Sequence, residues 1–149
     1  MISTSQQIFF KLPAIGILPI LVPLFGHNVP AGFPSPADDY IEGRLSLDEH
    51  LVPHKDSTFF VRAKGNSMVG AGIFDGNLLV VDKSLTPSSG DIVIAVIDGE
   101  LTVKRFIQRD GKVILKPENP SFKEIELKEG QELQVWGVVT STVKRFIKG

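Results

Sequence analysis

Cysteine is absent from this chain of 149 residues, which also has only one tryptophan, one tyrosine and two methionines. Without cysteine there is neither a disulfide framework nor a thiolate metal site. An excess of one charge is lacking too, because 16 Lys and Arg stand against 17 Asp and Glu, for a formal net charge of -1. Such a balance does not indicate a broad electrostatic surface for nucleic acid.

Histidine is scarce, with His27, His50 and His54 only. A zinc-protease helix carries two histidines four residues apart and a glutamate directly after the first. The pair His50 and His54 has this spacing, but Leu51 follows the first histidine and Pro53 interrupts the helix. We therefore expect neither a bound metal nor a cofactor.

A long uninterrupted apolar run is also missing. The apolar stretch near the start is broken by Pro13, Pro19 and Pro23, and it is shorter than the roughly 20 residues that span a bilayer. Residues 29–31 before Gly32 superficially fit a signal-peptidase site, but the first ten residues carry no basic cluster. We expect a cytoplasmic protein with one domain and an N-terminal arm.

The fold class expected from the pattern is mostly β. Hydrophobic residues make up 42% of the chain, and 14 Gly and 10 Pro indicate many turns. Apolar and β-branched segments bounded by turn residues predict strands at 57–64, 77–82, 91–97, 100–108, 112–116 and 132–143. Short helical turns are expected at 35–42 and 45–51, the second with Ser46 and Glu49 at capping-box spacing.

Two Asp-Gly pairs, at 98–99 and 110–111, predict tight hairpins. They enclose the segment 100–108, which would therefore be a strand with a neighbour on each side. A central strand is a place where a side chain can lose water.

The turn Gly65-Asn66-Ser67-Met68 directly follows the predicted strand 57–64. Gly65 gives the backbone freedom to reverse direction sharply, so Ser67 would sit exposed at a strand end. This is a possible nucleophile turn. A serine after Gly-Asn is more often an ordinary turn residue or helix cap, and local pattern alone leaves both readings open.

Lys104 is the residue that could activate such a serine, because the sequence offers no convincing His/Asp pair. Its strand alternates, with Thr102, Lys104 and Phe106 on one face. A lysine among apolar neighbours loses solvation of its ammonium form, so its pKa falls and the neutral amine can act as a general base. The alternative is a solvated lysine at a sheet edge.

Six segments occur together in this chain in an order that is similar to the LexA/UmuD family of self-cleaving Ser-Lys peptidases. They are residues 31–40, 65–68, 75–82, 90–95, 98–104 and 136–139. The UmuD branch is the one that the chain resembles most. The resemblance covers about residues 31 to 143. It implies a LexA/UmuD-type peptidase fold of twisted antiparallel sheets with short helical turns, preceded by an extended arm.

The resemblance also implies the site. Ser67 would be the nucleophile and Lys104 its general base, with the backbone N–H groups of Ser67 and Met68 stabilising the oxyanion. The scissile bond would be Ala31-Gly32, in the chain's own arm. Where Ala31 stands, the UmuD branch often has a cysteine of similar size.

Two parts of the chain follow from that bond, a cleavable arm at 1–31 and a peptidase and dimerisation domain at 32–149. The resemblance further implies an SOS mutagenesis protein whose self-cleavage is stimulated by the RecA filament on single-stranded DNA. The truncated homodimer would join a UmuC-like Y-family polymerase for error-prone translesion synthesis.

Three other readings stay open. A LexA-type repressor is disfavoured, since the thirty-one residues before the expected scissile bond are too few for a helix-turn-helix domain and hold one basic residue, Lys11. A signal-peptidase-like enzyme shares Ser-Lys chemistry but needs a membrane anchor. A catalytically idle interaction module could keep the same fold.

Overall fold

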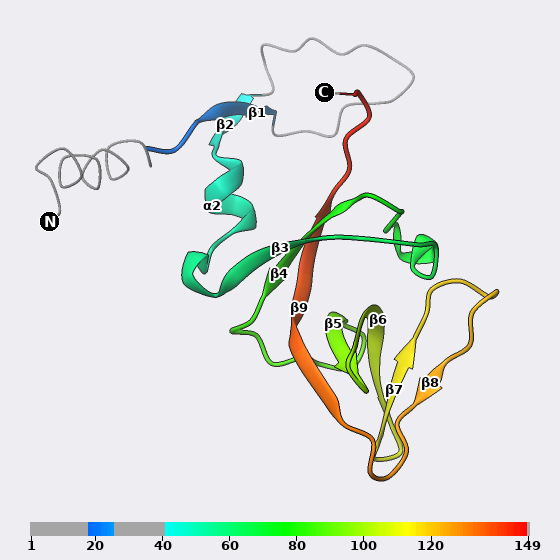
Figure 1. Ribbon diagram of the computed structural model, residues 1–149. Helices are drawn as coiled ribbons and strands as arrows, with labels where there is room; N and C mark the ends of the chain where they lie inside the picture. Colours follow the sequence, from blue (N-terminus) through cyan, green and yellow to red (C-terminus); the bar gives the residue numbers. More distant parts are fainter. Residues whose placement is uncertain (1–17, 26–40, 149) are drawn as a thin grey trace, which may run out of the picture. The chain divides into compact units, whose positions relative to one another are not determined.

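The computed structural model describes residues 18–25 and 41–148 (Figure 1). The chain divides into two compact units, residues 1–53 and 54–149. Most of the regular structure is antiparallel β-sheet with a few short helical turns. The predicted fold class is therefore confirmed.

The described residues of the first unit form a two-stranded antiparallel sheet and one short helix. Strand β1 (Val22–Phe25) pairs with β2 (Ile41–Leu45), and helix α2 (Leu47–Leu51) follows. The helical turn predicted at 45–51 is present, although its first residue belongs to β2. Ser46 precedes the helix without a side-chain cap hydrogen bond, so the capping-box spacing is not used.

The helical turn predicted at 35–42 fares differently. Residues 35–40 lie outside the described residues, and the last two residues of the segment fall in strand β2. Residues 41–45 show little alternation of apolar and polar side chains, so the sequence does not indicate a strand there. The strand forms because it pairs with β1. The expectation of helix was wrong for these two residues.

The second unit is a seven-stranded sheet in the order β3-β4-β9-β5-β6-β7-β8, with antiparallel pairing between neighbours. Its strands are β3 (Thr58–Arg62), β4 (Leu78–Asp82), β5 (Ile92–Ile97), β6 (Glu100–Arg109), β7 (Lys112–Lys116), β8 (Ile125–Glu126) and β9 (Leu133–Val143). Two 3-10 turns, η2 (Lys55–Ser57) and η3 (Val69–Ala71), interrupt the loops. All six strands predicted for this part of the chain are present.

The two tight hairpins are confirmed as well. Asp98 and Gly99 have φ of 50° and 84°, and Asp110 and Gly111 have φ of 54° and 76°. Positive φ at both central residues is the signature of the turn that suits a two-residue hairpin. The hairpins place β6 between β5 and β7, so Lys104 lies on an interior strand.

Strand β9 joins the two parts of this sheet, β3-β4 on one side and β5 to β8 on the other. It has 11 residues, and Figure 1 shows it running from the β5 side of the unit to the β4 side. Val138 is the pairing partner of both Val93 in β5 and Asp82 in β4. The neighbouring Gly137 allows close packing, because a Cβ there would lie 2.7 Å from Cγ1 of Val81.

Two clusters of buried apolar side chains form the core of the second unit. One contains Ala63, Met68, Ile73, Leu79, Val81 and Ile94. The other contains Val93, Ala95, Phe106, Leu115 and Val138. The first cluster includes side chains from the segment that follows β3, so burial of apolar surface fixes that segment against the sheet.

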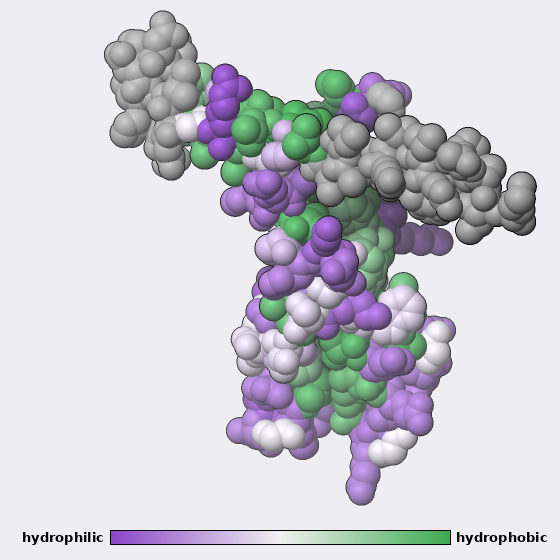
Figure 2. Space-filling view, turned by 90° about the vertical axis from the view of Figure 1, so that its left-hand side faces the viewer, coloured by the Kyte–Doolittle hydropathy of each residue, from purple (hydrophilic) through white to green (hydrophobic). Residues whose placement is uncertain are grey.

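Apolar side chains also remain on the surface of this unit. Phe60 is 57% exposed and Trp136 is 43% exposed. Figure 2 shows hydrophobic patches on the face it presents, interrupted by hydrophilic residues. Patches of this kind occur where proteins meet partners.

Candidate active site

Ser67 lies in the turn between β3 and η3, and the turn is held from both sides. Gly65 has φ of +87°, and its N–H donates to Oδ1 of Asp75 at 2.8 Å. Met68, directly after the serine, is 3% exposed and belongs to the first core cluster. A polar contact before the serine and a buried side chain after it therefore fix Ser67 in the turn.

A second segment clamps the same turn from outside. The backbone N–H of Glu118 donates to the carbonyl of Ser67 at 2.8 Å, and the N–H of Gly70 donates to the carbonyl of Glu118 at 2.7 Å. Nδ2 of Asn119 donates to the carbonyl of Asn66 at 2.8 Å. No local pattern predicts this clamp, because its contacts are mostly between backbone atoms and join residues about fifty positions apart.

Lys104 reaches Ser67 from β6. Its Nζ donates to Oγ of Ser67 at 3.0 Å, to Oγ1 of Thr102 at 2.8 Å and to the carbonyl of Val103 at 2.9 Å. Thr102 and Lys104 share one face of the strand, as the alternation predicted. The structure thus brings together the two side chains that the sequence singled out, and adds Thr102 as a neighbour of the amine.

Burial lowers the pKa of Lys104 from its ordinary value of 10.5, since partial removal from water penalises the ammonium form. As an ammonium, the group has three N–H donors, and the three acceptors match them. As a neutral amine, it has a lone pair that can accept the Ser67 hydroxyl proton. The arrangement can therefore shuttle a proton between Oγ and Nζ.

The pair opens into a cleft of about 190 Å³. Segments around β3 and β6 line it together with the Ser67 turn: Val61, Arg62, Ala63, Lys64, Gly65, Ser67, Met68, Ile73, Ile94, Leu101, Thr102, Val103 and Lys104. Apolar side chains such as Ile73 and Ile94 line part of the cleft, and the basic side chains Arg62 and Lys64 line it together with Lys104. An extended peptide segment with small or apolar side chains fits the apolar part.

The backbone N–H groups of Ser67 and Met68 were the expected oxyanion donors. In the described part of the chain, neither has a backbone or side-chain acceptor. Both are therefore free to donate to a substrate oxygen. The expected scissile pair, Ala31 and Gly32, lies outside the described residues.

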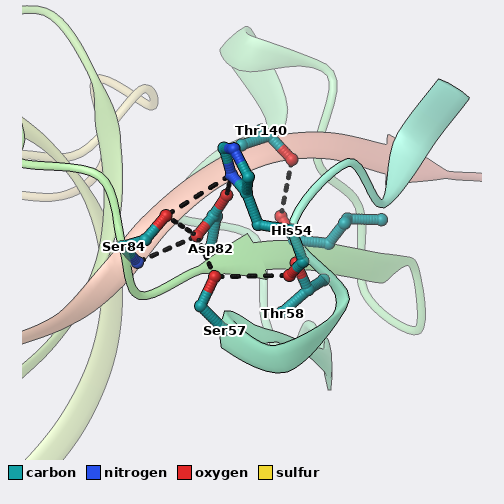
Figure 3. A network of polar contacts seen from close by, with 7 residues as sticks. His54, Ser57, Thr58, Asp82, Ser84 and Thr140 are labelled. Atoms are coloured by element: carbon teal, nitrogen blue, oxygen red, sulfur yellow. Dashed lines mark hydrogen bonds and ion pairs between the residues drawn. The ribbon is translucent and has the colours of Figure 1, made fainter. Parts of the chain in front are cut away.

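A His–Asp contact that the sequence did not suggest occurs elsewhere in the second unit (Figure 3). Nδ1 of His54 lies 2.6 Å from Oδ2 of Asp82, whose side chain is 4% exposed. Oγ of Ser57 and Oγ of Ser84 donate to Oδ1 of Asp82, at 2.9 and 2.6 Å. The two residues are 28 positions apart, too far for a local pattern to connect them.

This cluster has the residue types of a serine-hydrolase triad but not the geometry. In a triad, the carboxylate binds one imidazole nitrogen and the serine the other. Here both serine hydroxyls donate to the carboxylate, and Ser84 also approaches Nδ1 of His54 at 3.4 Å. The cluster instead ties the start of β3 to the end of β4.

A half-buried lysine bonded to a serine hydroxyl, in a cleft of an antiparallel β-protein, is the arrangement of serine peptidases that use an amine as the base. The chain belongs to the Peptidase S24-like family, which matches residues 23–140. The predicted resemblance to the LexA/UmuD family is confirmed at this level. Membership of this family supports serine peptidase chemistry, self-cleavage and a connection with SOS mutagenesis.

Three relatives illustrate the similarity. SamA of Salmonella typhimurium is 47% identical over 83% of this chain and 85% of its own length. ImpA of Escherichia coli is 45% identical over 83% of each chain. MucA of Escherichia coli is 42% identical over 82% of this chain and 84% of its own length. In the residues that the structure describes, no helix is long and apolar enough to cross a membrane.

Proposed function

We propose that this protein is a serine endopeptidase that cleaves its own chain at Ala31-Gly32, with Ser67 as the nucleophile and Lys104 as the general base. The observation that carries the proposal is the 3.0 Å hydrogen bond between Nζ of Lys104 and Oγ of Ser67. It lies in a cleft where burial lowers the pKa of the amine.

The reaction divides into acylation and deacylation. The neutral amine of Lys104 takes the Ser67 proton as Oγ attacks the carbonyl carbon of Ala31. The N–H groups of Ser67 and Met68 stabilise the oxyanion. The bond to Gly32 then breaks, and Lys104 returns the proton to the leaving amine.

Hydrolysis of the ester between Ala31 and Ser67 completes the cycle. Lys104 takes a proton from water as the water oxygen attacks the ester carbonyl, and it returns the proton to Oγ of Ser67. The products are an arm of residues 1–31 and a domain of residues 32–149. Two chemical steps replace one difficult hydrolysis.

The family membership supports a role for this cleavage in SOS mutagenesis. A protonated Lys104 cannot take the Ser67 proton, so we propose that cleavage is slow until a partner stabilises the docked arm, which removes the amine further from water. We propose the RecA filament on single-stranded DNA as that partner, which places the reaction in the cytoplasm. The 32–149 domain then forms a homodimer that joins a Y-family polymerase for translesion synthesis, and exposed side chains such as Phe60 and Trp136 provide apolar contact area.

Intact-mass analysis of the purified chain, incubated from neutral to alkaline pH, tests the chemistry. A fragment beginning at Gly32 should appear faster as pH rises, and it should be absent from Ser67→Ala and Lys104→Ala. Ser84→Ala is the matched control, because its hydroxyl bonds Asp82 and not Lys104, and it should cleave normally. If the wild type stays intact at every pH and with activated RecA filaments, an idle binding module becomes the better account.

A further inference from the structure

Arg105 directly follows Lys104 in strand β6. Its side chain makes different contacts, because adjacent residues of a strand point to opposite faces. Its Nε donates to Oε1 of Glu118 at 2.6 Å. Its Nη1 donates to the carbonyl of Gly90 at 2.5 Å. The two side chains of the ion pair are 29% and 21% exposed, so water screens the contact only in part.

Glu118 is also the residue that clamps the nucleophile turn. Its N–H holds the carbonyl of Ser67, and its own carbonyl accepts from Gly70. A continuous path therefore leads from Lys104 through the peptide bond to Arg105, across the ion pair to Glu118, and through one hydrogen bond to Ser67. It closes a ring with the direct contact between Nζ and Oγ.

We propose that Arg105 and Glu118 form a positioning pair that sets the separation between Oγ of Ser67 and Nζ of Lys104. This inference rests on the proposed function of the site. The planar guanidinium donates in fixed directions to two acceptors, Glu118 and Gly90, so it holds the 118 segment against β6. Without it, the segment that carries the Ser67 clamp is free to shift relative to the lysine.

Two other ion pairs in this sheet show what makes this one different. Arg109 contacts Glu124 at 3.8 Å, with side chains 55% and 44% exposed. Lys112 contacts Glu126 at 3.1 Å, with side chains 65% and 54% exposed. These are exposed surface pairs, and within the described residues no hydrogen bond or ion pair joins them to the Ser67 turn. They provide matched controls.

The test is the rate at which a fluorophosphonate labels Ser67 in the full-length chain, measured against pH. Oγ attacks phosphorus, fluoride leaves and Lys104 takes the proton, so the rate reports the dyad without needing the arm to dock. Glu118→Gln and Arg105→Gln should each lower the high-pH plateau about ten- to hundredfold, as expected for a small misplacement of reacting groups. Arg109→Gln and Glu126→Gln should match the wild type.

A role in positioning has signatures that a role in folding alone lacks. The double variant Arg105→Gln/Glu118→Gln should be no slower than either single variant, because each single substitution already removes one charge of the same ion pair. Arg105→Lys should recover part of the plateau, since it keeps the charge but not the two-acceptor geometry. The pH midpoint of labelling should move much less than the plateau, because burial, which lowers the pKa of Lys104, is largely kept.

The inference is overturned if Glu118→Gln and Arg105→Gln label at the wild-type plateau. If the Gln variants do not unfold cooperatively, Arg105→Lys and Glu118→Asp decide by the same plateau criterion. A wild type that labels no faster than Ser67→Ala contradicts the proposed function itself. The two failures are therefore distinguishable.

Discussion

Nζ of Lys104 lies 3.0 Å from Oγ of Ser67, across 37 residues of sequence. The serine comes from the turn after β3, at one edge of the sheet, and the lysine from β6, which lies beyond β4, β9 and β5 in the strand order. The sheet must therefore curve to bring these strands together. The cleft, lined by segments around β3 and by β6, is the result.

The lowered pKa of Lys104 predicts a pH-dependent effect on stability. Between the folded pKa and the ordinary value of 10.5, the unfolded chain binds a proton that the folded chain does not. Folding stability therefore rises with pH through this window. Below it, the folded state holds a partly buried ammonium at a cost.

Lys104→Met should accordingly abolish cleavage yet raise the melting temperature at pH 7, because it removes that buried charge. The difference from the wild type should shrink as pH approaches 10. Thermal unfolding monitored by circular dichroism at several pH values checks this. Lys112→Met, at an exposed lysine of β7, should show no comparable trend. A lower melting temperature for Lys104→Met at pH 7 would contradict the prediction.

Thr102→Val should show how much Thr102 contributes to the orientation of the Lys104 amine and how much to its pKa. The valine is nearly isosteric but removes the acceptor 2.8 Å from Nζ. Loss of one hydrogen bond worth about 1 kcal/mol should slow the high-pH cleavage rate roughly fivefold. Because an acceptor favours the ammonium form, its loss should also move the pH midpoint of cleavage downward.

Rates of self-cleavage across pH check this second prediction. Thr140→Val is the control, because that hydroxyl donates to the carbonyl of Val80, away from Ser67. An unchanged plateau and midpoint in Thr102→Val would show that the threonine does not act on the amine.

Local patterns were enough to predict most of the second unit. Alternating apolar residues and the Asp-Gly turns at 98–99 and 110–111 predicted its longer strands and both hairpins, because these signals depend on neighbours in sequence. Ser67 and Lys104 were singled out as candidates by their residue types and by the family resemblance. The pairing of strands β1 and β2, and the two-residue strand β8, left no local signal.

The supporting contacts of the site could not be predicted for a related reason. Glu118 holds Ser67 through its backbone, and backbone bonds place no demand on residue type. The ion pair of Glu118 with Arg105 crosses 13 positions, and many other charged pairs in this sequence were equally plausible. Only the folded sheet selects among them.

At Gly70, the contact with Glu118 requires a glycine. A Cβ at Gly70 would lie 2.6 Å from the carbonyl oxygen of Glu118, which is backbone and cannot rotate away. Gly70→Ala should therefore displace the Ser67 turn, cost about 1–3 kcal/mol and slow cleavage at least tenfold.

Gly137→Ala makes a useful comparison. Its Cβ would clash with Val81 at 2.7 Å, in the β4–β9 pairing, and it would not touch the Glu118 clamp. Loss of stability should be similar, but the folded variant should label at Ser67 faster than Gly70→Ala, because the clash reaches the Ser67 turn only through the first core cluster. Denaturant unfolding and fluorophosphonate labelling check both variants. Equal labelling rates in the two would contradict a specific role for the clamp.

Asp82 predicts how the second unit responds to acid. Hydrogen bonds from the Ser84 hydroxyl, and then from His54, hold the pKa of this carboxyl well below its usual value of 3.8. The folded state therefore releases a proton more readily than the unfolded chain. Asp82 contributes its stabilisation fully above pH 3.8, and the contribution is lost as pH falls below that value toward the folded pKa.

Asp82→Asn should lower the melting temperature at pH 7, because a neutral amide oxygen is a weaker acceptor for the hydroxyls of Ser57 and Ser84, and an amide nitrogen cannot accept from Nδ1 of His54. The gap to the wild type should narrow as pH falls below about 4, where the wild type begins to lose its own charged hydrogen bonds. Thermal unfolding from pH 7 to pH 2.5 measures the gap. Asp110→Asn, at an exposed hairpin turn whose positive φ suits asparagine, should stay close to the wild type throughout. A gap for Asp82→Asn that is constant with pH would mean that the carboxylate charge does not stabilise this cluster, and that only its shape matters.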